Sequence, residues 1–193
     1  MPRGRIMIVP HRRRREQKTD YKRRFSLLKS GKTRLVVRKS NKNVRCQFVE
    51  YQPAGDKTLF SADSRELAKL GWKGGTGNIP AAYLTGLLCG VRAKKKVKEA
   101  ILDLGLTRST KGNRTYAAVK GAVDAGISIP ISEEIVPGED RISGTHIASY
   151  ATHLKKESAS TFKKTFSGYE KAKLSPEKLP AHFGEVKAKI LKA

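Results

Sequence analysis

The sequence has 193 residues, with 41 Lys and Arg against 17 Asp and Glu, which gives a formal net charge of +24. This length predicts one domain with appendages. A chain with such a charge repels itself unless an anion neutralises it, which argues against an ordinary metabolic enzyme. Two cysteines, Cys46 and Cys89, form no disulfide framework, and no apolar run is long enough to span a membrane. The apolar stretch from Ile6 to Val9 is too short for the core of a signal peptide.

The positive charge is concentrated at the two ends of the chain. Residues 1–45 carry a net charge of +15 with 11 Arg, residues 46–154 carry +3, and residues 155–193 carry +6 from Lys alone. Arginine makes planar, bidentate phosphate contacts and stacks on bases, whereas lysine is a flexible point charge. Specific nucleic-acid contacts are therefore expected from the first segment rather than from the last.

The N-terminal part predicts an arm, a helix and three strands. Residues 1–11 have no periodicity and indicate a basic arm. Residues 12–29 predict a helix with one apolar stripe, formed by Tyr21, Phe25 and Leu28, and Gly31 is a plausible stop. Residues 34–40, 44–51 and 57–62 are rich in β-forming residues and are separated by turn sequences, which predicts an antiparallel meander.

Helices and strands alternate in the middle of the chain. Ser64 is the expected cap of a short helix ending at Leu70, residues 72–78 predict a loop, and Asn78 is the expected cap of a longer helix. The apolar stripe of that helix contains Gly86 and Gly90, which predicts close approach of a neighbouring element. Further on, residues 99–104 predict a strand, 114–125 a helix, 127–131 a strand or extended segment, and 145–154 a helix.

Residues 156–193 have only weak helical patterning and predict an extension that orders on a partner. The whole pattern indicates an α/β fold with a three-layer arrangement, a mixed sheet flanked by helices. We expect three parts: a basic N-terminal arm and helix (1–30), an α/β domain (31–155), and a Lys-rich C-terminal extension (156–193).

Motifs for other chemistry are weak. The Gly-rich loop 74–77 lacks the spacing of a P-loop or a dinucleotide fingerprint, and it is either a flexible turn before a capped helix or a phosphate contact. Trp72 is either a packed aromatic or a base-stacking residue. The four histidines have no metal-ligand spacing, and the acids around Pro137 form either a solvated loop or a patch for a basic protein.

The strongest pattern is basic. The run from Arg12 to Arg15 opens a helix whose charges barely mix in sign, and basic residues continue through the next strand and turn. Calmodulin-target and membrane-surface helices can look similar. A helix and an adjoining sheet face of one sign suit folded RNA better. The continuing basic residues are Lys32, Arg34, Arg38, Lys39, Lys42 and Arg45.

Three long segments carry a family resemblance: residues 12–43 (RRRREQKTDYKRRFSLLKSGKTRLVVRKSNKN), 76–93 (TGNIPAAYLTGLLCGVRA) and 105–126 (GLTRSTKGNRTYAAVKGAVDAG). Together they resemble the ribosomal protein L-eighteen family of the large subunit, whose eukaryotic counterpart is called L-five, and the chain length resembles archaeal members. The resemblance runs from about residue 12 to 154.

The resemblance implies a protein that binds 5S rRNA in the central protuberance of the large subunit of cytoplasmic ribosomes. The implied neighbours are 5S rRNA, the large-subunit rRNA and the ribosomal protein L-five of bacterial and archaeal naming, with no membrane and no small-molecule substrate. The implied RNA contacts are Arg12, Arg13, Arg14, Arg15, Lys18, Tyr21, Arg23, Arg24, Arg34, Arg38, Lys39, Ser40, Asn41 and Lys42. The loop from Trp72 to Asn78 is a further candidate through Trp72, Lys73, Thr76 and Asn78.

The sequence therefore predicts a structural RNA-binding protein without catalytic residues, cofactor or metal. A basic RNA-processing or RNA-modifying enzyme is one alternative, although no constellation of catalytic acids or histidines is visible. A DNA-binding architectural protein is the other. Residues 156–193 are expected to be dispensable for binding isolated 5S rRNA.

Overall fold

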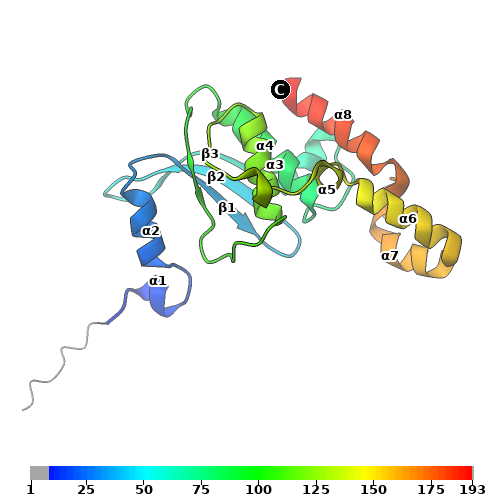
Figure 1. Ribbon diagram of the computed structural model, residues 1–193, viewed down its shortest axis with the longest axis horizontal. Helices are drawn as coiled ribbons and strands as arrows, with labels where there is room; N and C mark the ends of the chain where they lie inside the picture. Colours follow the sequence, from blue (N-terminus) through cyan, green and yellow to red (C-terminus); the bar gives the residue numbers. More distant parts are fainter. Residues whose placement is uncertain (1–8, 193) are drawn as a thin grey trace, which may run out of the picture.

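The computed structural model describes residues 9–192 (Figure 1), so residues 1–8 of the expected arm lie outside the described part. The strands are β1 (Arg34–Lys39), β2 (Val44–Glu50), β3 (Lys57–Asp63) and β4 (Ile101–Asp103). The α-helices are α1 (Arg12–Arg15), α2 (Tyr21–Leu28), α3 (Ile79–Ala93), α4 (Arg114–Asp124), α5 (Glu139–Ser143), α6 (Thr145–Glu157), α7 (Ala159–Lys171) and α8 (Leu179–Lys192). Three 3-10 helices complete the set: η1 (Ser64–Leu70), η2 (Glu133–Ile135) and η3 (Pro176–Lys178).

The strands form one mixed sheet in the order β3-β2-β1-β4. β1, β2 and β3 are the predicted antiparallel meander, and β4 pairs with β1 in parallel, with Val36 opposite Asp103. The predicted α/β class with a mixed sheet flanked by helices is confirmed. The segment 127–131 takes the extended alternative, since it makes a single bridge, from Ser128 to Glu99.

Helices α3 and α4 pack together against one face of the sheet. Their contact is so close that a Cβ on Gly86 would overlap the carbonyl oxygen of Ala118, and a Cβ on Gly121 would overlap that of Tyr83. The close approach predicted from the glycines of α3 is confirmed. The buried side chains Leu35, Val37, Cys46 and Phe48 point from the sheet into this layer.

The prediction that the C-terminal extension orders on a partner is wrong, because its helices fold within the single chain. Helix α8 packs on the outer side of α3, and its apolar residues Leu179, Phe183, Val186 and Ile190 belong to the main core. The layers therefore run from the sheet through α3 and α4 to α8. Helices α6 and α7 form a hairpin around Phe166 at the end of the molecule opposite α1 (Figure 1).

Two local predictions also differ from the structure. The helix expected over residues 12–29 is interrupted, because the chain turns at Gln17 (φ 52°) and Asp20 caps α2 by accepting a hydrogen bond from the backbone N–H of Arg23. Helix η1 is capped by Asp63 in a capping box with Glu66 rather than by Ser64. The Ser64 hydroxyl is buried and accepts from the backbone N–H of Val44. Within residues 9–192, no helix combines the length and apolarity needed to cross a membrane.

Candidate nucleic-acid interface

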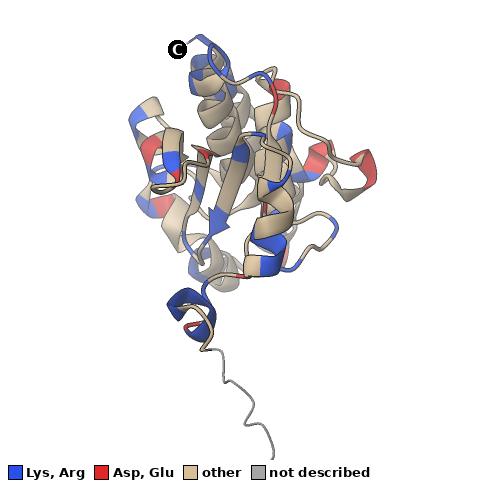
Figure 2. Cartoon of the chain, turned by 90° about the vertical axis from the view of Figure 1, so that its left-hand side faces the viewer, with Lys and Arg blue, Asp and Glu red and all other residues tan. Residues whose placement is uncertain are grey.

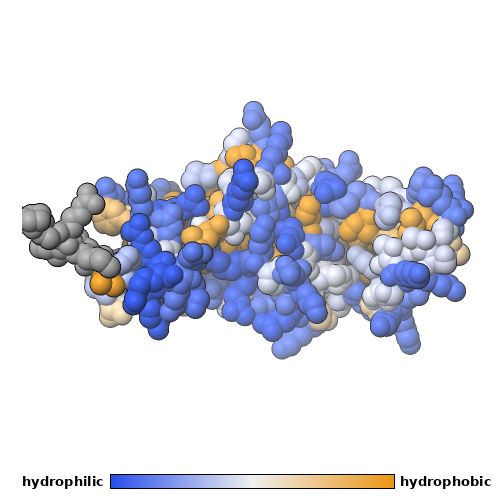
Figure 3. Space-filling model, turned by 90° about the horizontal axis from the view of Figure 1, so that it is seen from below, coloured by the Kyte–Doolittle hydropathy of each residue, from blue (hydrophilic) through white to orange (hydrophobic). Residues whose placement is uncertain are grey.

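Helix α1 consists of four arginines, all exposed, at one end of the molecule (Figure 2). Arg12 and Lys18 lie near Glu16, at 3.7 and 3.0 Å, whereas Arg14 and Arg15 make no ion pair with another residue in the described range 9–192. Exposed, unneutralised guanidinium groups are suited to bind phosphates. Hydrophilic residues cover most of the surface at this end (Figure 3).

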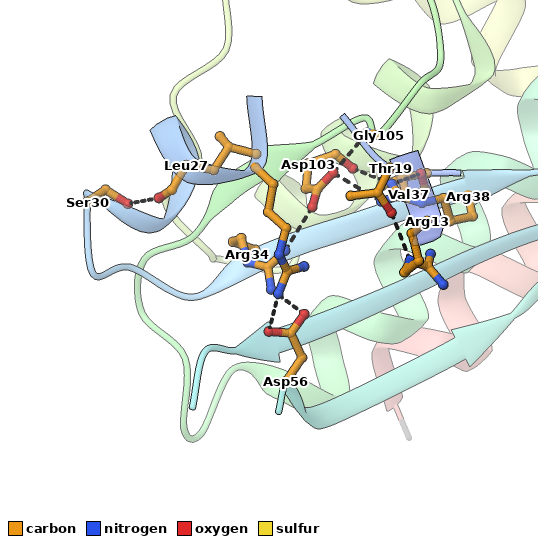
Figure 4. A network of polar contacts seen from close by, with 11 residues as sticks. Arg13, Thr19, Leu27, Ser30, Arg34, Val37, Arg38, Asp56, Asp103 and Gly105 are labelled. Carbon is orange, nitrogen blue, oxygen red and sulfur yellow. Dashed lines mark hydrogen bonds and ion pairs between the residues drawn. The ribbon is translucent and has the colours of Figure 1, made fainter. Parts of the chain in front are cut away.

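Behind this end lies a network of arginines and aspartates with the buried Arg34 at its centre (Figure 4). The Arg34 side chain is only 2% exposed, and its guanidinium donates to Asp103 Oδ2 at 2.9 Å and Asp56 Oδ2 at 2.7 Å. Arg24 also donates to Asp56, at 2.8 Å, and Arg38 donates to Asp103 at 3.0 Å. The network joins α2, β1, β4 and the 51–56 turn. Arg34 therefore holds these elements together and does not reach the surface where RNA would bind.

Both carboxylates of the network stay ionised. Burial raises the pKa of Asp56, but hydrogen bonds from Arg24 and Arg34 outweigh burial and lower the pKa below its usual value. Burial likewise raises the pKa of Asp103, and the charge of Arg38 with its hydrogen bond outweighs this effect. The two carboxylates therefore balance the charge of the buried Arg34 guanidinium, which would be costly to leave unpaired.

A cleft of about 420 Å³ lies between the α1–α2 turn and the edge of the sheet. Tyr21 and Leu27 give it apolar walls, and Arg38, whose side chain is 46% exposed, lies at its floor with Asp103. Five cationic residues line the cleft with only three acids; they are Arg13, Lys18, Arg23, Arg24 and Arg38. The cleft therefore belongs to the same positive surface as α1.

The sheet face opposite α3 continues this surface. Strand alternation puts Arg34, Val36 and Arg38 on this face, and Arg38 lies directly opposite Arg45 of β2. Arg34 is covered by the α2 end, but Arg38 and Arg45 are exposed. Arg34 and Arg38 thus share one strand face, and only Arg38 contributes to the accessible surface.

Three loops meet at the far end of β1. Arg114 donates to the carbonyl oxygens of Ser40, at 3.4 Å, and Gly77, and the Thr76 hydroxyl donates to that of Lys42 at 2.6 Å. Lys39 Nζ donates to Asn113 Oδ1 at 3.0 Å. The turn 40–43 and the loop 72–78, two separate sequence candidates, are therefore held side by side.

The third segment of this cluster, loop 104–113, was missed as a site by sequence reasoning. Arg108 and Lys111 are exposed on it, and Leu106 reaches the α1–α2 turn beside Arg14 and Tyr21. The sequence pattern that could have identified this loop as a candidate site is two basic residues, no acid and a glycine near each end. With this loop, the positive surface is continuous from α1 to the turn 40–43.

Some sequence candidates are not placed to contact RNA. Trp72 is 4% exposed, stacks on His182 with ring centroids 5.3 Å apart, and donates its indole N–H to the Gly75 carbonyl at 3.2 Å. Of the two roles expected for Trp72, the structure therefore shows a packed aromatic rather than an exposed base-stacking residue. Asn78 caps α3 by accepting from the Ala81 N–H at 2.9 Å, as predicted. Lys32 and Lys73, in contrast, are accessible: Lys32 is 52% exposed and pairs with exposed Glu99 at 2.7 Å, and Lys73 is exposed.

The described residues offer little to support catalysis. Residues 9–192 contain no group of His, Cys, Asp and Glu side chains that could hold a metal ion. Both thiols are fully buried, and burial raises the pKa of Cys46 and Cys89 above the ordinary value, which disfavours the nucleophilic thiolate.

Comparisons with known proteins agree with this picture. The family model described as ribosomal large subunit proteins 60S L5 and 50S L18 matches residues 7–100 and 91–132. The chain is similar to the large ribosomal subunit protein uL18 of Methanococcus maripaludis. The two are 55% identical over 184 residues, which cover 95% of this chain and 95% of that protein.

Proposed function

Because the chain belongs to the family of ribosomal large subunit proteins 60S L5 and 50S L18, we propose that it binds 5S rRNA and attaches it to the large-subunit rRNA in the central protuberance. Family membership makes the chain a structural component of the large subunit of cytoplasmic ribosomes, associated with rRNA and ribosomal proteins, and not an enzyme. The proposed protein neighbour is the ribosomal protein L-five of bacterial and archaeal naming.

The observation that carries the proposal is the continuous positive surface of α1, the cleft, the exposed sheet face and the loop cluster. Its cations are mostly arginines on several rigid elements, so they can contact phosphates at fixed separations. Folded RNA presents such phosphates in a fixed shape, and binding releases the counterions that surround them. The proposed contacts from the sequence that the structure leaves accessible are Arg12, Arg13, Arg14, Arg15, Lys18, Tyr21, Arg23, Arg24, Lys32, Arg38, Lys39, Ser40, Asn41, Lys42, Lys73 and Thr76.

The three parts proposed from the sequence, 1–30, 31–155 and 156–193, describe roles rather than independent folding units. Residues 1–30 and the sheet face would bind 5S rRNA together. The α6–α7 hairpin carries lysines at the opposite end of the molecule and would contact other rRNA (Figure 1). Helix α8 belongs to the core, so its removal is no test of RNA binding alone.

The test compares 5S rRNA binding of the full chain with that of two double variants. Arg14→Ala with Arg15→Ala removes two exposed arginines of α1, and Lys163→Ala with Lys164→Ala removes two exposed lysines of α7. The α1 variant should weaken binding and flatten the plot of log K against log salt by up to about 0.7–0.9 per lost phosphate contact. The α7 variant should leave affinity and slope nearly unchanged.

Equal losses in the two variants would contradict this location of the site. Competition with duplex DNA tests the ligand itself, because a protein fitted to folded 5S rRNA should prefer it over a DNA duplex at the same salt concentration.

A further inference from the structure

Phe25 is an exposed aromatic side chain on α2, one helical turn from Tyr21 of the proposed RNA surface. It is 62% exposed on α2, a helix without any buried residue, although sequence periodicity places it in the apolar stripe with Tyr21 and Leu28. Neither folding of α2 onto the sheet nor the arginine network uses this ring. The apolar surface of Phe25 is therefore available to a partner.

The neighbours of Phe25 identify the kind of partner. Residues three and four positions away on a helix lie beside each other, which places Lys22 and Lys29 next to the ring. Lys29 Nζ lies 5.0 Å from the ring centroid, and α2 carries no acid among residues 21–28. An apolar ring flanked by two cations complements a flat ligand that carries negative groups on either side of it. A nucleotide in an RNA strand has this chemistry, with a base between two phosphates.

We propose that Phe25 stacks on an unpaired nucleobase of the bound RNA, with Lys22 and Lys29 facing the phosphates that flank that base. This inference rests on the proposed RNA-binding function and adds a readout that phosphate contacts alone do not supply. The base must be unpaired, because bases within a helix are already stacked on both faces and the deep major groove of A-form RNA excludes side chains.

The stacking contact has a signature that differs from that of a phosphate contact. Loss of an aromatic platform weakens binding of single-stranded nucleotides by about 5- to 150-fold per base. Since no cation is removed, the same number of counterions is released, and the salt slope stays the same. Loss of an arginine of α1 lowers affinity and slope together.

The experiment measures binding of the full chain to transcribed 5S rRNA and to a fully paired RNA duplex of similar length. The variants are Phe25→Ala, Phe25→Trp and, as a matched control at the opposite end, Tyr150→Ala, whose side chain is 52% exposed on α6. Phe25→Ala should weaken 5S rRNA binding by about 5-fold or more at an unchanged salt slope. Duplex binding and the control variant should be unaffected.

Phe25→Trp supplies a direct probe. This variant should retain its affinity for 5S rRNA, and RNA binding should quench the fluorescence of the new tryptophan. Trp72 is buried against His182 and contributes a background fluorescence, which is measured with the unmodified protein. Because α2 buries no residue, circular dichroism and the melting temperature of both Phe25 variants should match those of the unmodified protein.

Three results would overturn the inference: unchanged 5S rRNA affinity of Phe25→Ala, an equal loss on the paired duplex, or no quenching of Phe25→Trp. The first is also the result expected if another protein covers the ring. Failure of the proposed function looks different, because the unmodified protein would then show no preference for 5S rRNA over duplex DNA.

Discussion

Arg34 and Asp103, 69 positions apart in the sequence, lie on neighbouring parallel strands and form a buried ion pair of 2.9 Å. Asp56 completes the charge balance from a third segment, at 2.7 Å from the same guanidinium. Arg34 thus links the elements that carry the positive surface of the protein, although its own side chain is not part of that surface.

Replacing Arg34 should destabilise the fold. Arg34→Met leaves Asp103, whose side chain is only 9% exposed, with Arg38 and the Gly105 N–H as its partners, so the cost should lie toward the lower end of the about 3–5 kcal/mol that loss of one member of a buried pair costs. The control is Arg45→Ala on the next strand, where the arginine is 52% exposed and its loss costs about 1 kcal/mol or less. Urea unfolding measures both. Similar midpoints for the two variants would show that the network contributes no special stability.

Arg114 should act as a positioning residue for the loop cluster. Its guanidinium contacts the carbonyl oxygens of Ser40 and Gly77, so Arg114→Ala frees two loops of the proposed RNA surface from each other. We expect weaker 5S rRNA binding with an unchanged salt slope, and partial rescue by Arg114→Lys. The control Arg108→Ala, from the exposed loop, should lower the slope by up to about 0.7–0.9. A slope loss in Arg114→Ala would instead make Arg114 a phosphate contact.

Stability should fall in acid because several carboxylates titrate below their ordinary range. The hydrogen bond from Arg65 lowers the pKa of Asp63 from 3.8 to about 2, and the pKa values of Asp56 and Asp103 are also lowered. A group whose pKa is lower in the folded state stabilises that state above its unfolded pKa, and this contribution is lost as the pH falls through the folded pKa. The free energy of unfolding should therefore decline between about pH 4 and pH 2.

The matched variant for this prediction is Asp63→Asn, because asparagine can still cap η1 but does not titrate. Its unfolding free energy should depend less on pH below 4 than that of the unmodified protein, as measured by urea unfolding at each pH. An identical pH profile would rule out Asp63 as a contributor.

The contact between α3 and α4 should tolerate no added methyl group. Gly86→Ala places a Cβ against the Ala118 carbonyl, and overpacking of this kind costs about 1–3 kcal/mol or more. Gly184→Ala on α8 is the control, because its Cβ meets nothing within 4 Å and alanine favours a helix by about 0.5–1 kcal/mol. Thermal unfolding should shift in opposite directions for the two variants. A shift of Gly86→Ala to higher temperature would contradict the close packing.

The parts of the fold that the sequence predicts depend on local signals. The turn residues between strands specify the meander, and Asn78 before an apolar stripe specifies the start of α3. The interruption of the N-terminal helix is harder to predict, because it needs the positive φ of Gln17 and the cap at Asp20 to outweigh a run of good helix formers.

The candidate site shows the same division. The basic pattern locates the positive surface, but it cannot separate Arg34 from Arg38, which share a strand face. Their difference depends on Asp56 and Asp103, which come from distant segments, and on α2, which covers one of the two. The role of Trp72 as a packed aromatic likewise depends on a distant residue, because His182, 110 positions away, stacks on the indole ring.

The docking of α8 on α3 sets the order of events during synthesis. Leu179, Phe183, Val186 and Ile190 complete the main core, so the body cannot close until α8 has been translated. The arginines of α1 precede α8 in the sequence and therefore leave the exit tunnel before it does. On the proposed function, α1 of the nascent chain would therefore contact RNA before the loops that shape the rest of the surface are in place, and recognition of RNA shape would follow that first contact.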